Sequence, residues 1–524
     1  MKTDRLNTTE IFKYKIFIVL ATLLCMTSIS LSLNDPVEAA VSGSYSYCGN
    51  SSFITQMQNI VSGGVVPSGG HTYYVATDGS DDADGSQEHP YQTINRGLRD
   101  LVEGDTLMIR GGTYYENIDV YMSGDSGHYI TIENYPSEEV ILSGEKMKGA
   151  DPMMMNIGGS YLCIRGLKFM DLACENAAAV NMEPGANHII LAGLTIENIR
   201  IPKTNSKDSC ANAILIFGDS EYENINNVLI YDCFISDCDT GYSEAVSVTG
   251  NVSNINVVNN TIDDTHNIGI DFSGNYGYCP DDSLDHPRKC LAAGNVVKNC
   301  VADYATSYGI YVDGGQDIMI EYNEVSNCGG GIEIGAEERA SKEKYQTQNI
   351  KVINNLLSYN IDAGMAIGGY KMLAGNVDSV TVKHNVCQEN GLDDGVILSI
   401  SKCSNIDISY NKFVSNEAQG GATIVDSQMS LFYTKDVSFS HNTYSNGNSA
   451  NDTAFTWLHK NYTKFADWVE ASGDEESTYD TSTSRSKSID TSNITIGANG
   501  TDSLDDTDQE DSFWLVRLWR SIFK

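Results

Sequence analysis

The chain has 524 residues, and its 70 Asp and Glu against 33 Lys and Arg give a formal net charge of −37 at pH 7. Such an acidic chain is not expected to bind nucleic acid, because that needs a basic face. It would bind an anionic polymer only where a cation or a local basic patch offsets its own charge. Hydrophobic residues are 41% of the chain, enough for a sizeable core.

Residues 1–40 have the features of an export signal. A basic start precedes an apolar run from Ile16 to Met26, and Ala39 and Ala40 are small residues suited to cleavage. The run is short for a membrane span, so an uncleaved anchor is the alternative. We expect a secreted, extracellular protein, with association to the cell surface as a second option, and a monomer.

Export permits disulfides, for which the sequence offers local pairs. Cys233 with Cys238 and Cys279 with Cys290 are candidates. Free cysteines buried as small hydrophobic side chains are an equal alternative. The sequence leaves this choice open.

Residues 41–72 are rich in Ser and Gly and are expected to be a poorly structured linker. The sequence then predicts a helix around residues 94–102, followed by the strand Gly-Asp-Thr-Leu that begins at Gly104. A helix at this place would cap the open end of a stack of strands, where an exposed edge would pair with other chains.

A short motif of alternating apolar residues recurs along the chain around a Gly, Asp or Asn. Its centres are Gly166, Gly193, Asp232, Asn260, Asn295, Asn323, Asn355, Asn385, Asn411 and Asn442. Neighbouring centres are 26 to 39 residues apart. A period of that length with two-residue alternation predicts a parallel β-solenoid, all-β, with about ten or more coils in one domain.

The start of this region resembles that of secreted right-handed parallel β-helix proteins, the group that holds the pectate lyases of polysaccharide lyase family 9. The shared features are the Gly-Ser-Asp opening at Gly79, the Pro-Tyr-Gln-Thr-Ile step at Pro90, the Gly-Asp-Thr-Leu strand at Gly104 and the Gly-Thr-Tyr turn at Gly112. With the coils, the resemblance covers roughly residues 73–470. The resemblance implies a right-handed β-helix with an N-terminal cap. It is specific for this fold and much less specific for an enzymatic activity.

After the coils, an aromatic-rich element up to residue 470 is expected to close the far end of the solenoid. Residues 471–512 are rich in Ser, Thr and Asp and predict a disordered acidic tail. Residues 513–524 would form a basic amphipathic helix. That helix would either dock on the solenoid or contact a membrane surface or a partner.

A second strand in each coil carries polar residues that point outward. Because strand residues alternate between faces, the stacked coils align these residues in columns. One column holds Ser247, Asp271, Tyr311 and Glu333, and the next holds Thr249, Ser273, Asp313 and Gly335. Like charges this close are costly unless a cation or a shared proton offsets them.

A hard cation with oxygen ligands, with Ca²⁺ as the expected ion, would resolve this repulsion. The expected ligands are Asp271, Asp313 and Glu333, together with the loop acids Asp281 and Asp282. The alternative is that outward acids of an acidic protein gather by chance in solvent. In family 9 lyases aspartates hold calcium and a lysine acts as base, but no motif here assigns that lysine to one position.

Long loops follow these strands, at 274–289, 338–348 and 369–371, and would wall a groove. Expected substrate contacts are Tyr276, Tyr311, Glu337 and Tyr370. For β-elimination on a uronate polysaccharide, calcium would neutralise the uronate carboxylate and a cationic side chain would take the proton. The candidate bases are Arg288 and Lys289 first, then Arg339 and Lys371.

Two other functions fit the same residues. An inverting glycoside hydrolase, or an epimerase, could use Asp271, Asp313 and Glu333 as acid and base without a metal, and a neutral glycan would suit the acidic charge better. A non-catalytic solenoid that binds carbohydrate or serves as a surface structure is the third possibility. The sequence favours the calcium-dependent, pectate-lyase-like enzyme.

Overall fold

The structure is a computed structural model that describes residues 45–149, 151–202, 209–368, 375, 377–392, 395–415, 423–426, 434–446 and 449–481. All of them belong to one compact unit, Gly43–Lys524. The predicted signal at 1–40 and the predicted basic segment at 513–524 lie outside the described residues. Within the described ranges, no helix is both long and apolar enough to cross a membrane.

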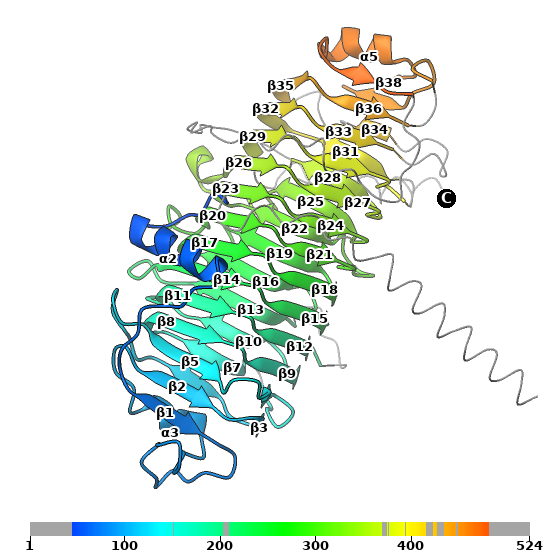
Figure 1. Cartoon of the computed structure of the whole chain (residues 1–524). Coiled ribbons are helices and arrows are strands. Elements are labelled where there is room, and N and C mark those ends of the chain that lie inside the picture. Colours follow the sequence, from blue (N-terminus) through cyan, green and yellow to red (C-terminus); the bar gives the residue numbers. More distant parts are fainter. Residues whose placement is uncertain are drawn as a thin grey trace, which may run out of the picture. The chain divides into compact units, whose positions relative to one another are not determined.

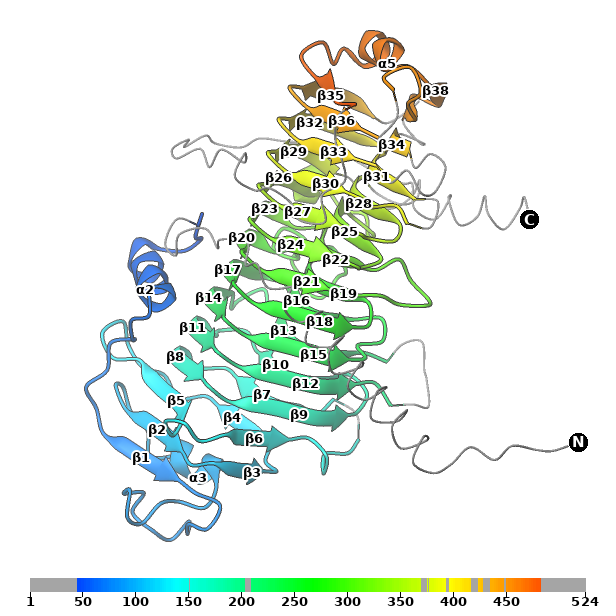
Figure 2. The same cartoon turned by 45° about the vertical axis from the view of Figure 1, so that its right-hand side comes forward.

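In the described residues, short strands stack into three sheets of 13 strands each, and successive coils add one strand to every sheet (Figures 1 and 2). The predicted right-handed parallel β-helix is confirmed. The first sheet consists of β1 (Thr72–Val75), β2 (Thr106–Ile109), β5 (Ile130–Asn134), β8 (Ser160–Arg165), β11 (Asn187–Ala192), β14 (Ile225–Tyr231), β17 (Val252–Val258), β20 (Arg288–Ala293), β23 (Gln316–Glu321), β26 (Thr347–Ile353), β29 (Val377–Lys383), β32 (Cys403–Ser409) and β35 (Lys435–Ser440).

The second sheet carries the outward columns predicted above. It consists of β4 (Ile118–Val120), β7 (Met153–Ile157), β10 (Ala177–Met182), β13 (Ala211–Gly218), β16 (Glu244–Gly250), β19 (Ile268–Ser273), β22 (Tyr308–Asp313), β25 (Gly330–Gly335), β28 (Ala363–Ile367), β31 (Val396–Ile400), β34 (Thr423–Asp426), β37 (Phe455–Trp457) and β38 (Lys460–Tyr462). Its pairs are parallel up to β37, and β38 pairs antiparallel to β37. That reversal marks the end of the coils.

The third sheet consists of shorter strands. These are β3 (Gly112–Tyr114), β6 (Val140–Ser143), β9 (Lys168–Ala173), β12 (Thr195–Arg200), β15 (Phe234–Cys238), β18 (Thr261–Thr265), β21 (Val296–Lys298), β24 (Glu324–Ser326), β27 (Leu356–Ser358), β30 (Val386–Gln388), β33 (Lys412–Val414), β36 (Thr443–Ser445) and β39 (Thr478–Tyr479). A 3₁₀ turn, η1 (Glu343–Tyr345), precedes β26.

The interior between the three sheets is filled by Ile, Val and Leu from every coil. Cysteines join this core: Cys233, Cys238, Cys279 and Cys290 are buried free thiols, so the candidate pairs Cys233/Cys238 and Cys279/Cys290 do not form. Burial raises the pKa of the Cys233 thiol to about 12. These side chains therefore act as small buried hydrophobic groups.

A buried ladder of seven asparagines runs along the bend between the first and third sheets. Its members are Asn260, Asn295, Asn323, Asn355, Asn385, Asn411 and Asn442. The Oδ1 atom of Asn355 accepts hydrogen bonds from the backbone N–H and the side-chain amide of Asn323, both at 2.9 Å. The residues that precede the last ladder positions, among them His384 and His441, adopt positive φ, which forms the bend.

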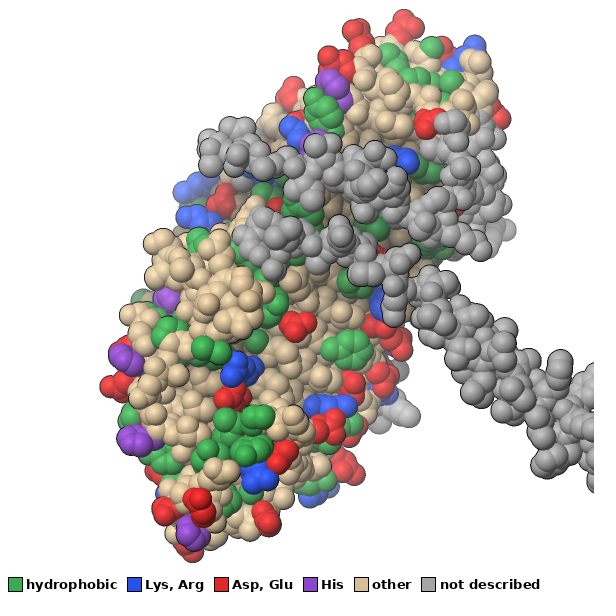
Figure 3. Space-filling view, in the orientation of Figure 1, with side chains coloured by type: hydrophobic (Ala, Val, Ile, Leu, Met, Phe, Trp, Pro, Cys, Tyr) green, Lys and Arg blue, Asp and Glu red, His purple; other side chains and the backbone are tan. Residues whose placement is uncertain are grey.

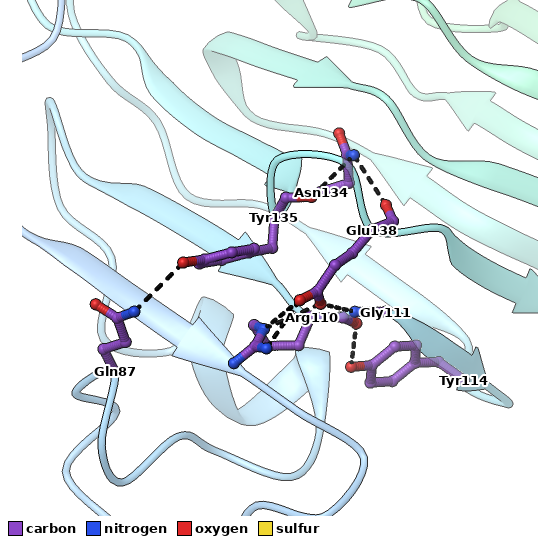
Figure 4. Close-up of polar contacts among 7 residues, drawn as sticks. All are labelled: Gln87, Arg110, Gly111, Tyr114, Asn134, Tyr135 and Glu138. Carbon is purple, nitrogen blue, oxygen red and sulfur yellow. Dashed lines mark hydrogen bonds and ion pairs between the residues drawn. The ribbon is translucent and has the colours of Figure 1, made fainter.

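The turn between β2 and β3 is held by an ion pair (Figure 4). Arg110 donates from Nε and Nη2 to the Glu138 carboxylate at 2.8 to 3.1 Å, and Glu138 also accepts the Gly111 N–H at 2.7 Å. The Tyr114 hydroxyl donates to the Arg110 carbonyl at 2.8 Å, and the Arg110 guanidinium lies 4.5 Å from the centre of the Tyr135 ring. These contacts explain the Gly-Thr-Tyr turn seen in the sequence.

Two expectations for the N-terminal side differ from the structure. Residues 41–72 include a helix, α2 (Ser51–Val61), whose Phe53 and Met57 lie one helical turn apart and are buried against the first sheet. Asn50 caps this helix by accepting the Phe53 N–H. The predicted capping helix exists but is shorter, α3 (Ile94–Leu98).

At the other end, the predicted boundary at residue 470 falls about ten residues early. Helix α5 (Phe465–Ser472) places Trp468 fully inside, stacked 4.7 Å from Phe455. Asp474 then accepts hydrogen bonds from Tyr444 and Trp468, and β39 pairs with β36. The expected aromatic closure is present and continues through the last strand.

Candidate functional site

The predicted outward columns exist in the second sheet, where β16, β19, β22 and β25 are consecutive neighbours (Figure 1). Asp271 pairs in register with Ser247 on one side and with Tyr311 on the other, and Tyr311 pairs with Glu333. Asp313 pairs with Gly335 in the adjacent column. The fold therefore brings the three predicted acids Asp271, Asp313 and Glu333 onto one face within three coils.

These acids are buried. Asp271 is only 3% exposed, and Asp313 and Glu333 are similarly withdrawn from solvent. One oxygen of Asp271, Oδ1, is buried with no hydrogen-bond partner. Unpaired buried oxygens are costly, so a proton or a ligand at this atom would stabilise the site.

A fourth carboxylate, Glu244, joins the cluster and was missed from the sequence. Val246 faces the core, so strict alternation between inward and outward residues would place Glu244 inside the solenoid as well. The alternation breaks between these two residues, because Ala245 also faces the core. A Cβ on Gly269 would meet the interior side chains of Val297 and Cys300, although its neighbour Ile270 also faces the core. Two successive inward positions put Glu244, at the strand start, on the outer face.

The carboxylates raise one another's pKa. Burial, then the nearby carboxylates of Glu244, Asp313 and Glu337, raise the pKa of Asp271 well above its ordinary value. Burial is also the main cause that raises the pKa of Glu244 to about 7. Burial and the Glu337 carboxylate raise the pKa of Asp313 and of Glu333. At neutral pH some of these groups therefore carry a proton.

Asp313 differs from Asp271 in its hydrogen bonds. Its Oδ2 accepts the Tyr276 hydroxyl and its Oδ1 accepts the Glu337 N–H, each at 2.5 Å. Both bonds favour the ionised form of Asp313, against the effect of burial on its pKa. The Asp271 carboxyl, with its unpaired oxygen, is better suited to keep a proton.

The loop 274–287 covers this region and is held by buried polar contacts. Asp285 accepts the backbone N–H groups of Gly277 and Cys279 at 2.6 and 2.9 Å. Arg288 donates to the carbonyls of Leu284 and His286 and to the side chain of Asn251. These contacts fix the segment that delivers Tyr276 to Asp313.

Aromatic rings lie beside the acids. Tyr276 and Tyr278 stack with their centres 5.9 Å apart, and Tyr278 meets the edge of Phe217 at 5.1 Å. A Cβ on Gly335 would lie 3.0 Å from the Tyr311 hydroxyl oxygen and 3.2 Å from Glu333 Oε1, so glycine makes room for both side chains. The predicted contacts Tyr276, Tyr311 and Glu337 are thus brought to the acids.

Other predicted residues lie elsewhere. Asp281 and Asp282 are exposed at the loop tip, where Asp281 accepts hydrogen bonds from Ser283. Lys289 is on the first sheet, where its positive charge opposes the rise that burial causes in the pKa of the Cys48 thiol. Arg339 is exposed. Tyr370 and Lys371 lie outside the described residues.

The donor set bears on the predicted calcium. Buried carboxylate oxygens, one of them unpaired, are the ligand type that a hard cation prefers. Across the described ranges, no three or more His, Cys, Asp or Glu side chains are arranged to hold a metal ion. Calcium binding by Asp271, Asp313 and Glu333 stays a prediction.

Two family models match the chain: a Pel9A-like right-handed β-helix region over residues 73–264 and a right-handed β-helix region over residues 290–464. The uncharacterized protein YwoF of Bacillus subtilis is 30% identical over 434 residues, which cover 78% of this chain and 88% of YwoF. Pectate lyase PEL9 of Emericella nidulans is 38% identical over 78 residues, which cover 14% of this chain and 19% of PEL9.

Among solved structures, the GH136 lacto-N-biosidase of Eubacterium ramulus aligns with a TM-score of 0.44 at 13% identity, over 82% of this chain and 70% of the biosidase. A shared fold does not define an activity, so the chemistry depends on the site.

Proposed function

Because the chain belongs to the Pel9A-like right-handed β-helix proteins, we propose that it is a carbohydrate-active enzyme that cleaves glycosidic bonds in a polysaccharide. The observation that carries the proposal is the carboxylate cluster of Glu244, Asp271, Asp313 and Glu337, of which Asp271 and Asp313 are buried. The first three have raised pKa values, and the cluster lies beside aromatic rings on one outer face. Paired carboxylates in different protonation states are what glycosidic cleavage needs.

The proposed roles follow from the hydrogen bonds. Asp271, whose raised pKa favours the protonated form, donates its proton to the departing glycosidic oxygen. Asp313, whose ionised form is favoured by the hydrogen bonds from Tyr276 and the Glu337 N–H, takes a proton from the attacking water. Glu244 titrates together with these neighbouring carboxylates, because its pKa of about 7 lets it gain or lose a proton near neutral pH.

A calcium-dependent lyase on a uronate polysaccharide is the second candidate, supported by the unpaired Oδ1 of Asp271. The ion would supply charge neutralisation at the uronate carboxylate, but the predicted ligands Asp271, Asp313 and Glu333, all among the described residues, are not arranged in this structure to hold it jointly. Of the predicted bases, Arg288 is engaged in the loop, and Lys289 lies on a different sheet. The first proposal therefore uses more of the observed geometry.

The test is to incubate the chain with soluble polysaccharides, uronate-containing and neutral, with calcium and with chelator. Reducing ends without an unsaturated product support hydrolysis. An absorbing unsaturated product that requires calcium supports the lyase. Cleavage of none of the polymers would contradict both.

Asp313→Asn is expected to lower the rate about 100-fold or more, the usual contribution of a positioned acid or base. The matched control is Asp264→Asn, because Asp264 is an exposed aspartate with positive φ, a conformation that Asn tolerates well. Equal loss in both variants would contradict the role of Asp313.

Secretion is part of the proposal, supported by the features of residues 1–40. Expression of the full chain in a bacterial host, followed by recovery of a shortened protein from the medium, would support it. Retention of the uncleaved chain in the membrane would contradict it.

A further inference from the structure

The outer face of the second sheet carries a second polar cluster, several coils from the acids. It consists of Tyr121, which follows β4, Asn156 on β7, Asn181 on β10 and Glu183, which follows β10. We propose that these four side chains form a distal subsite for a neutral, hydroxyl-rich sugar unit of the same polysaccharide. The inference rests on the proposed function. It adds how long the substrate must be and which charge its unit at this subsite carries.

The cluster is a connected hydrogen-bond network. The Tyr121 hydroxyl donates to Glu183 Oε2 at 2.9 Å and accepts from the Asn156 amide at 2.8 Å. The Asn156 amide also donates to Glu183 Oε1, and the Asn181 amide donates to Asn156 Oδ1 at 2.7 Å. Four polar side chains from three coils are thus held in fixed positions, as a binding site requires.

One atom of this network lacks a partner. Asn181 is only 8% exposed, and its Oδ1 is buried with no hydrogen bond. A buried acceptor without a donor costs free energy that a ligand hydroxyl would recover. Asn181 therefore marks the place where a ligand would bind.

Buried polar atoms without a hydrogen-bond partner also occur on this face between Asn181 and the acids. Asn181, Leu215, Ser247 and Asp271 form one column through successive strand pairs. The Oγ1 atom of Thr249, in the adjacent column, is buried without a hydrogen-bond partner. The Oδ1 atom of Asp271 is buried and unpaired in the same way. Three unpaired polar atoms thus occur on one face of the sheet, which is the pattern expected where an extended chain of hydroxyls binds.

The spacing sets the length of the substrate. Three strand steps separate Asn181 from Asp271. At about 4.8 Å per step this is about 14 Å, the length of about three sugar units. A chain that fills both places needs about four units or more, so the subsite favours a polymer over a disaccharide.

The residues also set the chemistry. Tyr121 is 55% exposed, and its ring packs over Gly158, where any Cβ would lie 2.5 Å from ring carbons. The ring offers an apolar face to the C–H groups of a sugar, while Glu183 and Asn181 accept hydrogen bonds from hydroxyls. The Glu183 carboxylate would repel a uronate, so the unit bound here is neutral.

The experiment measures binding, so it does not depend on cleavage. The full chain with Asp313→Asn is run in affinity electrophoresis through gels that contain xylan, galactan, polygalacturonate or alginate. Oligosaccharides of two to eight units from each retained polymer then compete. Tyr121→Ala and Asn181→Ala are compared with Tyr222→Ala, a control at a tyrosine that is 87% exposed on another loop. Glu183→Gln adds a variant that keeps the shape of the network.

We expect neutral polymers to retain the protein, and oligosaccharides of five or more units to bind about tenfold tighter than dimers. The Tyr121 and Asn181 variants should bind long oligosaccharides about as weakly as dimers, with dimer binding unchanged. The Tyr222 variant should bind both as its parent does. Glu183→Gln should weaken long oligosaccharides and relax the rejection of polygalacturonate.

The results separate the two proposals. Long-chain binding that depends on Tyr121 and Asn181, in a protein whose unmutated form cleaves nothing, would keep the subsite and contradict the enzyme. If Tyr121→Ala and Asn181→Ala are made in the unmutated chain and cleave with the same length dependence as the parent, the enzyme would stand and the subsite would be overturned. Retention by none of the four gels would also overturn the subsite.

Discussion

Replacing Glu244 by glutamine should change how the stability of the solenoid depends on pH. The pKa of Glu244 is raised from 4.5 to about 7 in the folded protein, mainly by burial. The folded state therefore binds this proton more tightly than the unfolded chain does. Its contribution to stability is complete below about pH 4.5 and is lost as the pH rises through about 7.

The magnitude follows from the shift. A rise of about 2.5 pKa units corresponds to about 3 kcal/mol of folding free energy lost by pH 8 or above. With about 2.1 cal/mol/K of unfolding entropy per residue, that is about 3 °C for a unit of about 440 residues. The glutamine side chain in Glu244→Gln would carry no charge at any pH. It could still accept the hydrogen bond from the Ser243 hydroxyl, whose oxygen lies 3.3 Å from Glu244 Oε2.

The assay is differential scanning calorimetry of both proteins at several pH values from 4.5 to 8.5. The melting temperature of Glu244→Gln minus that of the parent should rise with pH, from near zero to about 3 °C. Glu338→Gln, which removes an exposed carboxylate from the next loop, should show no such trend. A difference that is constant with pH, or that grows toward acid, would refute the reasoning.

Three further variants test the fold and the loop. Asn355→Ala should cost about 3 kcal/mol or more in denaturant unfolding, because it leaves the buried N–H of Asn323 and other ladder groups unpaired. Recovery with Asp at this position would contradict the need for an amide donor. Arg288→Met should leave the melting temperature within a few degrees but speed proteolysis inside 274–287, since the loop loses three side-chain hydrogen bonds; unchanged cleavage would count against this. Trp468→Ala should cost about 3–5 kcal/mol and expose the last coils first in hydrogen exchange, whereas uniform loss of protection along the chain would contradict a local closing role.

The surface charge also has a structural context. Acidic side chains are spread over the face of the described residues seen in Figure 3, with Lys and Arg between them. Several acids on the strands pair with a cation in a neighbouring coil, as Asp263 does with Lys298 at 3.0 Å. The cluster at Asp271 is different, because burial and neighbouring acids govern its pKa values.

Some features could be predicted from local sequence because they repeat. Ladder asparagines such as Asn355, and the alternation around Asp271, occur once per coil, so a single chain displays its own period and faces. This pattern alone predicts that Asp271, Asp313 and Glu333 share one outer face. Strand alternation is a property of the backbone, and stacking transmits it from coil to coil.

What the sequence could not show depends on breaks in that regularity and on long-range contacts. Glu244 was missed because two successive residues face inward at one corner, and alternation cannot report such a break. The network of Tyr121, Asn156 and Asn181 joins three coils through side-chain hydrogen bonds that leave no local signal. The sequence by itself determined the solenoid, its period and the face of the acids, because these depend on near neighbours along the chain. Only the tertiary structure decided which acids share protons, because the burial and charge coupling that shift their pKa values arise where distant segments meet.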